Sequence, residues 1–161
     1  MFLFLLLDFI FYIIYFSNPK KGAIEMDAKE LVQLAKEARE YAYAPYSKFK
    51  VGAAVRTKNN KIYKGANIEN ASYGLTNCAE RTAIFKAISE GDLDLEEIAV
   101  IADTDRPVSP CGACRQVMAE FFAPNAKLYL ANLRGDMIIT TVKELLPGAF
   151  TQEDLNESEK N

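Results

Sequence analysis

The chain alternates between two periods of apolar side chains, and these periods predict its secondary structure. Apolar residues three and four positions apart indicate amphipathic helices, and runs of β-branched and aromatic residues bounded by turn residues indicate strands. The predicted elements are, in chain order, a helix over 27–43, strands over 49–57 and 61–68, a helix over 79–90, a strand over 97–103, a helix over 112–122, strands over 127–133 and 136–142, and a short helical turn that ends at Pro147.

This order mixes helices with strands, which favours an α/β domain whose central sheet carries helices on its faces. The first helix is predicted to start beside Met26, with Asp27 as its N-cap and Glu30 completing a capping box. No repeat or linker interrupts the chain, so we predict one domain over residues 26–161. Its polar tail, from about Thr151, is predicted to fray.

The first 25 residues differ from the rest, because their first 16 are almost wholly apolar and are interrupted only by Asp8. That run is shorter than the roughly 18–20 residues of a spanning helix. It also lacks the basic start and the small-residue cleavage site of a signal peptide. We expect residues 1–25 to be an appendage that reflects a start codon assigned too far upstream, in a cytoplasmic protein. The alternative is a short membrane-associated anchor, with membrane contact only if residues 1–25 are retained.

Composition limits the classes of function. The net charge is −3 and the pI is about 5.1, which opposes nucleic-acid binding, although a nucleoside without phosphates remains a possible substrate. The chain has no histidine, so it lacks the commonest general base and metal ligand. Its three cysteines cannot form a closed set of disulfides, and three buried structural thiols are one interpretation.

The spacing of the cysteines favours a metal site instead. Cys78 lies in Cys-Ala-Glu, and Cys111 and Cys114 lie in Pro-Cys-Gly-Ala-Cys, each at the start of a predicted helix. A helix N-terminus stabilises thiolates, the form that binds metal. Three thiolates leave one tetrahedral position of Zn²⁺ open for water, whose pKa the metal lowers. A redox pair or half of a structural zinc knuckle are the alternatives.

The residues that follow Cys78 complete the predicted chemistry. Glu80 lies two positions after the cysteine, so it can carry protons beside the metal without binding it. Arg81 can donate hydrogen bonds to thiolate sulfur and offset the negative charge of a three-thiolate site, and Arg115 could do the same after Cys114. The alternative is that Glu80 and Arg81 form a solvated surface pair.

These motifs resemble a known family. Cys-Ala-Glu followed by Pro-Cys-Gly-Ala-Cys matches the all-cysteine form of the zinc-deaminase signature. The segments "YAPYSKFKVGAAV", "GANIENASYGLTNCAERTAIFKA", "SPCGACRQVMAEF" and "ELLPGAF" resemble, in order, cytidine deaminases of the small homotetrameric type, from about Met26 to Phe150. The resemblance implies a three-layer α-β-α fold around a central mixed five-stranded sheet. It also implies one Zn²⁺ per subunit and hydrolytic deamination of cytidine and 2′-deoxycytidine, a reaction of pyrimidine salvage.

The resemblance further implies how the substrate is held. Asn67 and Glu69 would hold the ribose hydroxyls, and residues at alternate strand positions do point the same way. Glu80 would move protons to the ring N3 and to the leaving amine. The remaining implied contacts are Phe49 along the base pocket, the backbone N–H of Ala79 on the base carbonyl, and Tyr73 and Phe150, which tetramers of this type lend to a neighbouring site.

Two other functions compete with this prediction. One is a related zinc deaminase that acts on another amino-heterocycle, and the other is a non-catalytic module stabilised by zinc. Glu80 favours an enzyme, because a closed structural site has no use for a carboxylate beside an open metal position.

Overall fold

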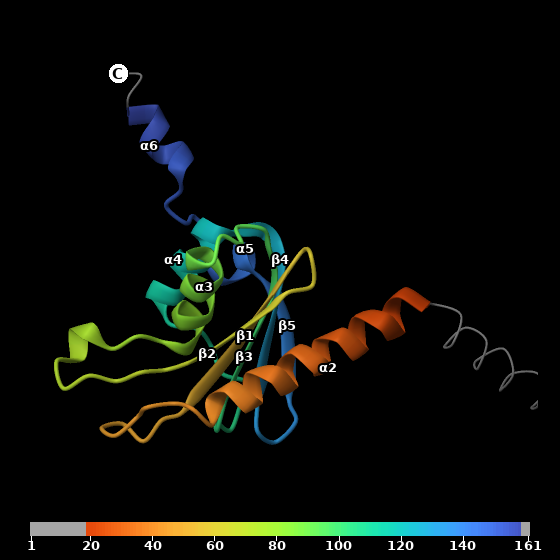
Figure 1. Cartoon of the computed structure of the whole chain (residues 1–161). Helices are drawn as coiled ribbons and strands as arrows, with labels where there is room; N and C mark the ends of the chain where they lie inside the picture. The colour runs from red at the N-terminus through yellow and green to blue at the C-terminus, as the bar shows by residue number, and fades with distance from the viewer. Residues whose placement is uncertain (1–18, 159–161) are drawn as a thin grey trace, which may run out of the picture. The chain divides into compact units, whose positions relative to one another are not determined.

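The computed structural model describes residues 19–158 of the chain, with side chains over 28–156 (Figure 1). The chain divides into two units, residues 1–30 and 31–161, and helix α2 (Pro19–Arg39) crosses the division. Because α2 begins at Pro19, the predicted start at Met26 with Asp27 as N-cap is wrong. The predicted appendage lies mostly outside the described residues. The other elements are β1 (Val51–Thr57), β2 (Ile62–Ala66), the 3₁₀ turn η1 (Tyr73–Leu75), α3 (Ala79–Ser89), β3 (Leu95–Ala102), α4 (Gly112–Phe121), β4 (Phe122–Asn132), β5 (Met137–Thr141), α5 (Val142–Leu145) and α6 (Gln152–Ser158).

The five strands form one mixed sheet in the order β2-β1-β3-β4-β5. Strands β3 and β4 are parallel, with α4 in the crossover between them, and the other three pairs are antiparallel. Every residue of β1 is buried, and β3 is buried over most of its length. These two strands read as apolar runs because helices cover both faces of the sheet.

Two glycines show how closely the helices approach the sheet. A Cβ atom on Gly52 of β1 would lie 2.0 Å from the carbonyl oxygen of Ala35 in α2. A Cβ atom on Gly65 of β2 would lie 2.4 Å from the backbone nitrogen of Ala83 in α3. Gly65 pairs with Ala53, the neighbour of Gly52, so the two glycines face opposite sides of the sheet. The predicted three-layer α-β-α arrangement is therefore confirmed, with residues 31–39 of α2 on one face and α3 on the other.

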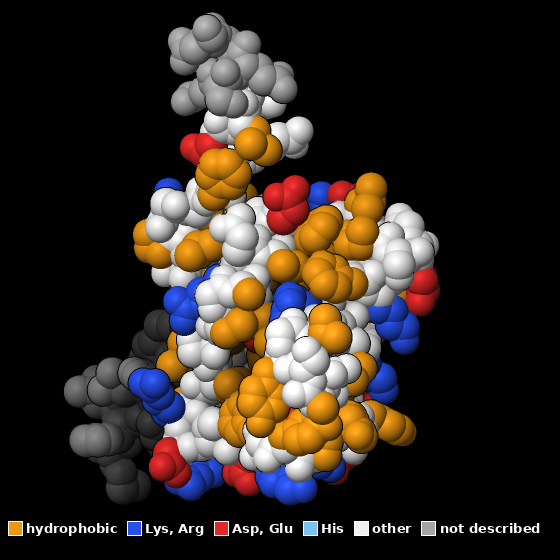
Figure 2. Space-filling model, turned by 90° about the vertical axis from the view of Figure 1, so that its left-hand side faces the viewer, with side chains coloured by type: hydrophobic (Ala, Val, Ile, Leu, Met, Phe, Trp, Pro, Cys, Tyr) orange, Lys and Arg blue, Asp and Glu red, His pale blue; other side chains and the backbone are white. Residues whose placement is uncertain are grey.

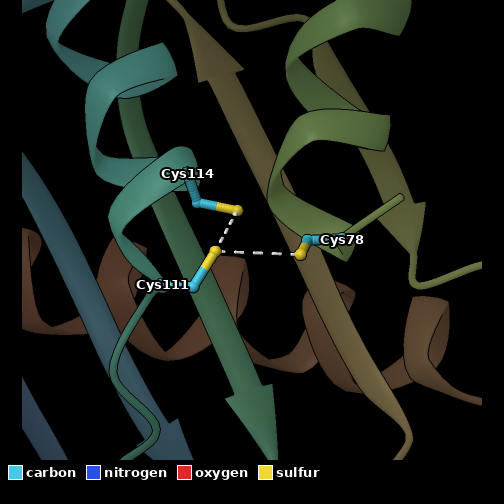
Figure 3. Close-up of side chains that lie close together, drawn as sticks. All are labelled: Cys78, Cys111 and Cys114. Atoms are coloured by element: carbon cyan, nitrogen blue, oxygen red, sulfur yellow. Dashed lines mark hydrogen bonds between the residues drawn. The ribbon is translucent and has the colours of Figure 1, made fainter. Parts of the chain in front are cut away.

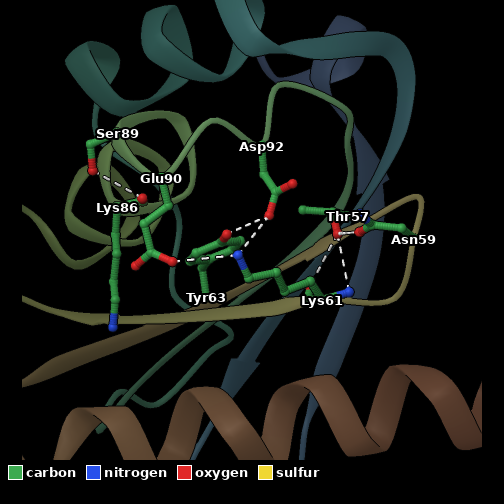
Figure 4. A network of polar contacts seen from close by, with 8 residues as sticks. All are labelled: Thr57, Asn59, Lys61, Tyr63, Lys86, Ser89, Glu90 and Asp92. Atoms are coloured by element: carbon green, nitrogen blue, oxygen red, sulfur yellow. Dashed lines mark hydrogen bonds and ion pairs between the residues drawn. The ribbon is translucent and has the colours of Figure 1, made fainter.

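Helix α3 is also fastened at its C-terminal end. Lys61 extends its Nζ atom to within 3.1 Å of Oδ2 of Asp92 and 3.4 Å of Oε2 of Glu90, and this Nζ lies 4.7 Å from the ring centre of Tyr63 (Figure 4). The Tyr63 hydroxyl donates to Asp92, and this hydrogen bond holds the pKa of Asp92 below its usual range. Gly91 ends the helix at φ = 89°, as predicted. This network fixes the C-terminal end of α3. The N-terminus of the same helix carries the predicted chemistry.

The structure corrects three further predictions. Helix α2 ends at Arg39 rather than at residue 43, and β4 begins at Phe122, five residues before the predicted strand. The tail predicted to fray contains α6, whose start is held by hydrogen bonds from the Thr151 backbone N–H (2.7 Å) and hydroxyl (3.1 Å) to the Asp154 carboxylate. Within the described residues, none of the helices combines the length and the apolar content needed to cross a membrane.

Candidate active site

Three cysteines from two helix N-termini meet on one side of the sheet (Figure 3). Cys78 is the N-cap of α3, Cys111 is the N-cap of α4, and Cys114 lies in the first turn of α4. Their Sγ atoms are 3.9 Å apart between Cys78 and Cys111 and 3.5 Å apart between Cys111 and Cys114. All three sulfur atoms lie within 4.8 Å of one another.

This spacing fits zinc. Tetrahedral Zn–S bonds of about 2.3 Å place two sulfur ligands about 3.8 Å apart. The observed separations bracket that value and far exceed the length of a disulfide bond. Cys114 is buried, Cys78 is half-buried and Cys111 is exposed, so the cluster is reached from solvent on the Cys111 side. The cysteines therefore suit a metal with a position open to water and substrate.

The thiols differ in their readiness to ionise. The neighbouring thiol of Cys114 and the guanidinium of Arg81 lower the pKa of Cys78 to about 5. The proximity of Cys78 raises the pKa of Cys114, because a thiolate on Cys78 disfavours a second negative charge, and burial raises it further. Cys78 is thus the first of the pair to become a thiolate, and a divalent cation that bound here would displace the proton that Cys114 retains.

Glu80 lies in the first turn of α3, two residues after Cys78, and its side chain is only 4 % exposed. Burial raises the pKa of this carboxyl group, and the nearby charge of Cys78 adds to the effect. The Cys114 thiol offsets part of this rise, so the carboxyl group of Glu80 lies beside the sulfur cluster. A buried carboxyl group with a raised pKa holds a proton more readily than an exposed one, as suits a general acid–base.

The two predicted arginines have different partners. Arg81 places its Nη2 atom 3.6 Å from Sγ of Cys78 and 3.3 Å from the carbonyl oxygen of Thr76, as expected for a residue that stabilises a thiolate. Arg115 instead donates its hydrogen bonds to oxygen atoms of Ser109, Pro110 and Leu145. The suggestion that Arg115 also bonds a cysteine sulfur is therefore wrong for the described chain.

Asn67 lies just after β2 and is 8 % exposed. Its Oδ1 accepts a hydrogen bond from the Val51 backbone N–H at 2.8 Å, and its Nδ2 donates to the Phe49 carbonyl at 2.8 Å. The amide thus holds the start of β1 and the residue predicted to line the base pocket. Phe49 itself is 43 % exposed, so its ring is accessible.

Glu69 fastens a loop that the sequence left unexplained. Its carboxylate accepts hydrogen bonds from the backbone N–H groups of Tyr46 (2.8 Å) and Ser47 (3.2 Å) and from the Ser47 hydroxyl. The hydroxyl contact contributes most to holding the pKa of Glu69 below its usual range. These three residues, with Tyr73 and Thr76, line a cavity of about 380 Å³. Tyr46 and Ser47 belong to the segment "YAPYSKF". In the sequence, the feature that could have indicated this contact is a polar residue that follows a proline turn.

The other residues predicted to contact substrate are Ala79, which is buried, and Tyr73 and Phe150, which are exposed in the single chain. Ala79 follows Cys78 and precedes Glu80, and its side chain is fully buried. Its backbone N–H belongs to the first turn of α3, where such groups lack partners within the helix. The Tyr73 ring is 75 % exposed and meets Tyr46 edge-on, with 6.1 Å between the ring centres. Phe150 is also exposed, and its carbonyl oxygen accepts a 2.7 Å hydrogen bond from Gln116. Figure 2 shows the side of the molecule on which the loops around η1 project, and hydrophobic side chains gather on this side. The exposed hydrophobic residues of these loops include Tyr43, Tyr46, Ile68, Tyr73 and Leu75.

The fold and this site define a class of protein, the metal-dependent hydrolytic deaminases, and comparisons with known proteins specify the family. The sequence profile of the "Cytidine and deoxycytidylate deaminase zinc-binding region" matches residues 25–130. The chain is 64% identical over 132 residues to the cytidine deaminase of Halalkalibacterium halodurans, covering 82% of this chain and 100% of that protein. It is 58% identical over 131 residues to the cytidine deaminase of Sporosarcina psychrophila, covering 81% and 96%.

A solved structure agrees with the fold. The crystal structure of cytidine deaminase from Burkholderia pseudomallei superimposes with a TM-score of 0.74 at 52% identity, covering 76% of this chain and 98% of that one. The chain therefore belongs to the cytidine and deoxycytidylate deaminase family, and the predicted family, fold and enzyme class are confirmed. It carries the zinc-binding region of that family, with a cysteine cluster able to hold one ion.

Proposed function

We propose that this enzyme hydrolytically deaminates cytidine and 2′-deoxycytidine to uridine and 2′-deoxyuridine, releasing ammonia, as a step of pyrimidine salvage. One observation carries the proposal: three cysteine sulfurs converge at a zinc-like spacing beside the buried carboxyl group of Glu80. A structural zinc site would need a fourth ligand and would gain nothing from a carboxyl group whose pKa is raised.

Cys78, Cys111 and Cys114 would hold the ion. When bound, Zn²⁺ supplies a Lewis acid that makes water a nucleophile near neutral pH. Glu80 takes the proton that water loses as its oxygen attacks C4 of the pyrimidine, and passes it to ring N3. It then moves the second proton of that water to the amino nitrogen, so that the C4–N bond breaks and ammonia leaves. The raised pKa of Glu80 suits a group that must bind and release protons in one cycle.

Arg81 balances the charge of this site. Three thiolates with one divalent cation sum to −1, which weakens the cation as a Lewis acid. The guanidinium of Arg81 contacts the sulfur of Cys78 at 3.6 Å and withdraws part of that charge. Its role is to tune the site without touching the substrate.

The nucleoside contacts belong to the loops around the 380 Å³ cavity. Glu69 lines it and keeps its carboxylate ionised, which suits the diol of a ribose. Asn67 retains one lone pair and one N–H beyond its bonds to Val51 and Phe49, and these are proposed for the ribose as well. Phe49 would cover the base, and the Ala79 backbone N–H would donate to the base carbonyl.

The proposal includes an assembly and a location. We infer a homotetramer in which Tyr73 and Phe150 complete neighbouring sites, and the exposure of both rings in the single chain supports this. We also infer a catalytic domain over residues 26–161, with 1–25 as an appendage, and a cytoplasmic location. The profile match that begins at residue 25 supports the domain boundary. A neutral nucleoside, rather than a nucleic acid, fits the acidic chain.

The test is to incubate the purified protein with cytidine while ultraviolet absorbance is followed and zinc is quantified on the same sample. The expected result is one zinc ion per chain and conversion to the uridine spectrum. Protein that holds zinc and leaves cytidine unchanged, but converts another amino-heterocycle, would identify the related deaminase instead. Light scattering tests the tetramer independently.

A further inference from the structure

Arg115 lies directly after Cys114, and its guanidinium donates three hydrogen bonds to oxygen atoms rather than to sulfur. Its Nε atom donates to the carbonyl of Pro110 at 2.9 Å, its Nη2 to the hydroxyl of Ser109 at 2.7 Å, and its Nη1 to the carbonyl of Leu145 at 3.0 Å. One planar cation thus joins the loop before a cysteine ligand to the end of a helix 30 residues further along the chain.

The first arm of Arg115 bears on Cys111. Pro110 is buried, and its carbonyl belongs to the planar peptide group that also contains the nitrogen and Cα of Cys111. Cys111 is the exposed member of the cluster, so side-chain packing does little to fix its sulfur. Fixing the orientation of the Pro110 carbonyl therefore fixes the direction from which Cys111 offers its sulfur.

The second arm bears on the C-terminal segment. Leu145 is the last residue of α5, where carbonyl groups lack partners within the helix, and a cation is favourable there. Four residues then lead from α5 to Phe150. Its carbonyl accepts a 2.7 Å hydrogen bond from Gln116, the neighbour of Arg115 on α4. The residues directly after Cys114 thus hold both ends of the segment that carries Phe150.

We propose that Arg115 is a positioning residue that fixes the metal-binding loop at Cys111 and the 145–150 segment in one arrangement, with Gln116 as its second contact to that segment. Retention of zinc and placement of Phe150 are thereby coupled through the first turns of α4. Only the arm at Phe150 rests on the proposed function, because the role of Cys111 follows from the sulfur cluster alone.

The fork of the guanidinium is what this arrangement requires. Lysine keeps the positive charge but has a single ammonium group, which cannot match three acceptors in fixed directions. A role through charge alone would be kept by lysine and lost with glutamine. A role through geometry would be lost with both, and Arg115→Lys therefore separates the two.

The experiment compares zinc release from the intact holoenzyme to an excess of a colorimetric chelator, for wild type, Arg115→Lys and Arg115→Gln. We expect both variants to retain zinc about 10–100-fold less well. Arg134→Lys is the matched control, since Arg134 pairs with the exposed Asp105, and it should release zinc like wild type. Wild-type retention in Arg115→Lys, or its rescue of a loss seen in Arg115→Gln, would overturn the proposal.

Two further measurements keep the test decisive. Ser109→Ala removes a single acceptor without threatening the fold, so it should speed zinc release even if the arginine variants do not fold; unchanged release would count against the proposal. Hydrogen exchange should quicken over residues 146–150 in Arg115→Lys, where unchanged exchange would refute the coupling, and in Gln116→Ala, where unchanged exchange would remove Gln116 as the second contact. In Gln116→Ala the KM for cytidine should rise while zinc retention stays normal. Because zinc release and exchange need no substrate, they decide the inference even if cytidine is not turned over.

Discussion

In the first turn of α3, the Nη2 atom of Arg81 lies 3.6 Å from Sγ of Cys78, at the half-buried edge of the cysteine cluster. The Nε atom of the same guanidinium is buried and has no hydrogen-bond partner in the described chain. A buried polar group without a partner costs free energy, so its orientation calls for an explanation. The orientation that brings Nη2 of Arg81 to the sulfur leaves its Nε atom without a hydrogen bond.

This relationship predicts how the zinc-free protein responds to pH. The pKa of Cys78 is lowered from 9.0 to about 5, mostly by the neighbouring Cys114 thiol and then by Arg81. A lowered pKa contributes stability that is fully present above pH 9 and is lost as the pH falls through about 5. Cys114 has the opposite sign, because its pKa is raised, and its contribution is lost above pH 9. The contribution of these two thiols to the free energy of unfolding of the zinc-free protein should therefore rise between about pH 5 and 9 and fall beyond it, while the raised pKa of Glu80 opposes the rise.

Arg81→Gln should move the acid end of this range upward, because it removes the contributions of the guanidinium to the pKa of Cys78 but leaves that of Cys114. The measurement is a titration of thiolate absorbance in zinc-free protein, with chemical unfolding at each pH. Arg134→Gln, at an exposed ion pair, should leave the curve unchanged. A Cys78 titration that is identical with and without Arg81 would contradict the role assigned to this arginine.

Glu80→Gln should separate activity from stability. Burial raises the pKa of Glu80, so its ionised form costs folding free energy, and that cost grows as the pH rises through the raised pKa. The amide removes this cost, and we expect a gain of about 0.5–2 kcal/mol at neutral pH. Turnover should fall by about 10²–10⁴-fold or more, because no histidine can replace the carboxylate.

Steady-state deamination and urea unfolding of zinc-loaded protein test both halves of the Glu80 prediction. Glu120→Gln is the control, since Glu120 is an exposed residue of α4, and it should change neither quantity. A variant that loses stability together with activity would show that Glu80 is mainly a structural residue.

The sequence predicted those parts of the fold that depend on local periodicity. The strands β1 and β3 and the helices α3 and α4 lie where apolar spacing placed them, within two or three residues. The start of β4 was missed because Pro124 and Asn125 read as turn residues, yet Phe122 pairs with Leu95 beyond an irregularity in the ladder. Helix α6 was missed because a polar segment without an apolar stripe gives no helical signal.

The residues of the candidate site were likewise predicted only in part from the sequence. The cysteines and Glu80 were predicted because their spacing along two helix starts is itself the chemical signal. The partners of Arg115 were not, because Leu145 lies 30 residues away and approaches only through the packing of α5 beside α4. The role of Asn67 in holding Phe49 was likewise hidden, since it depends on the register between two strands.

Asn67→Asp tests that bracing role with one changed atom. The Oδ1 atom can still accept from Val51, but an oxygen replaces the Nδ2 that donates to the Phe49 carbonyl. Two acceptors then face each other in a nearly buried position, and we expect a loss of about 1–3 kcal/mol. The KM for cytidine should rise, because the Phe49 ring loses its fixed position.

Urea unfolding and steady-state kinetics measure the two effects of Asn67→Asp. The control is Asn70→Asp, because Asn70 uses only its Oδ1, which accepts from the Ser72 N–H at 2.8 Å, and that acceptor is retained. If both variants unfold and bind alike, the amide of Asn67 is not a brace.

Gly65→Ala tests whether the distance between α3 and the sheet governs the metal site. The added Cβ would lie 2.4 Å from the nitrogen of Ala83 and 2.6 Å from the carbonyl oxygen of Ala79. Both atoms are helix backbone, which cannot rotate away like a side chain, so the first turn of α3 must move outward. That turn carries Glu80 and follows Cys78 directly, and overpacking of this kind costs about 1–3 kcal/mol.

The expected result for Gly65→Ala is lower stability in urea together with faster release of zinc to a chelator and a lower kcat. Gly112→Ala is the matched control, because Gly112 also lies beside the cysteines but has no atom within 4 Å of an added Cβ. As the first residue of α4 it should tolerate alanine, with a gain of up to about 1 kcal/mol. A Gly65 variant that is destabilised but keeps zinc and kcat would mean that the α3 start adjusts independently of the sheet, since the shift would then not reach Cys78 or Glu80.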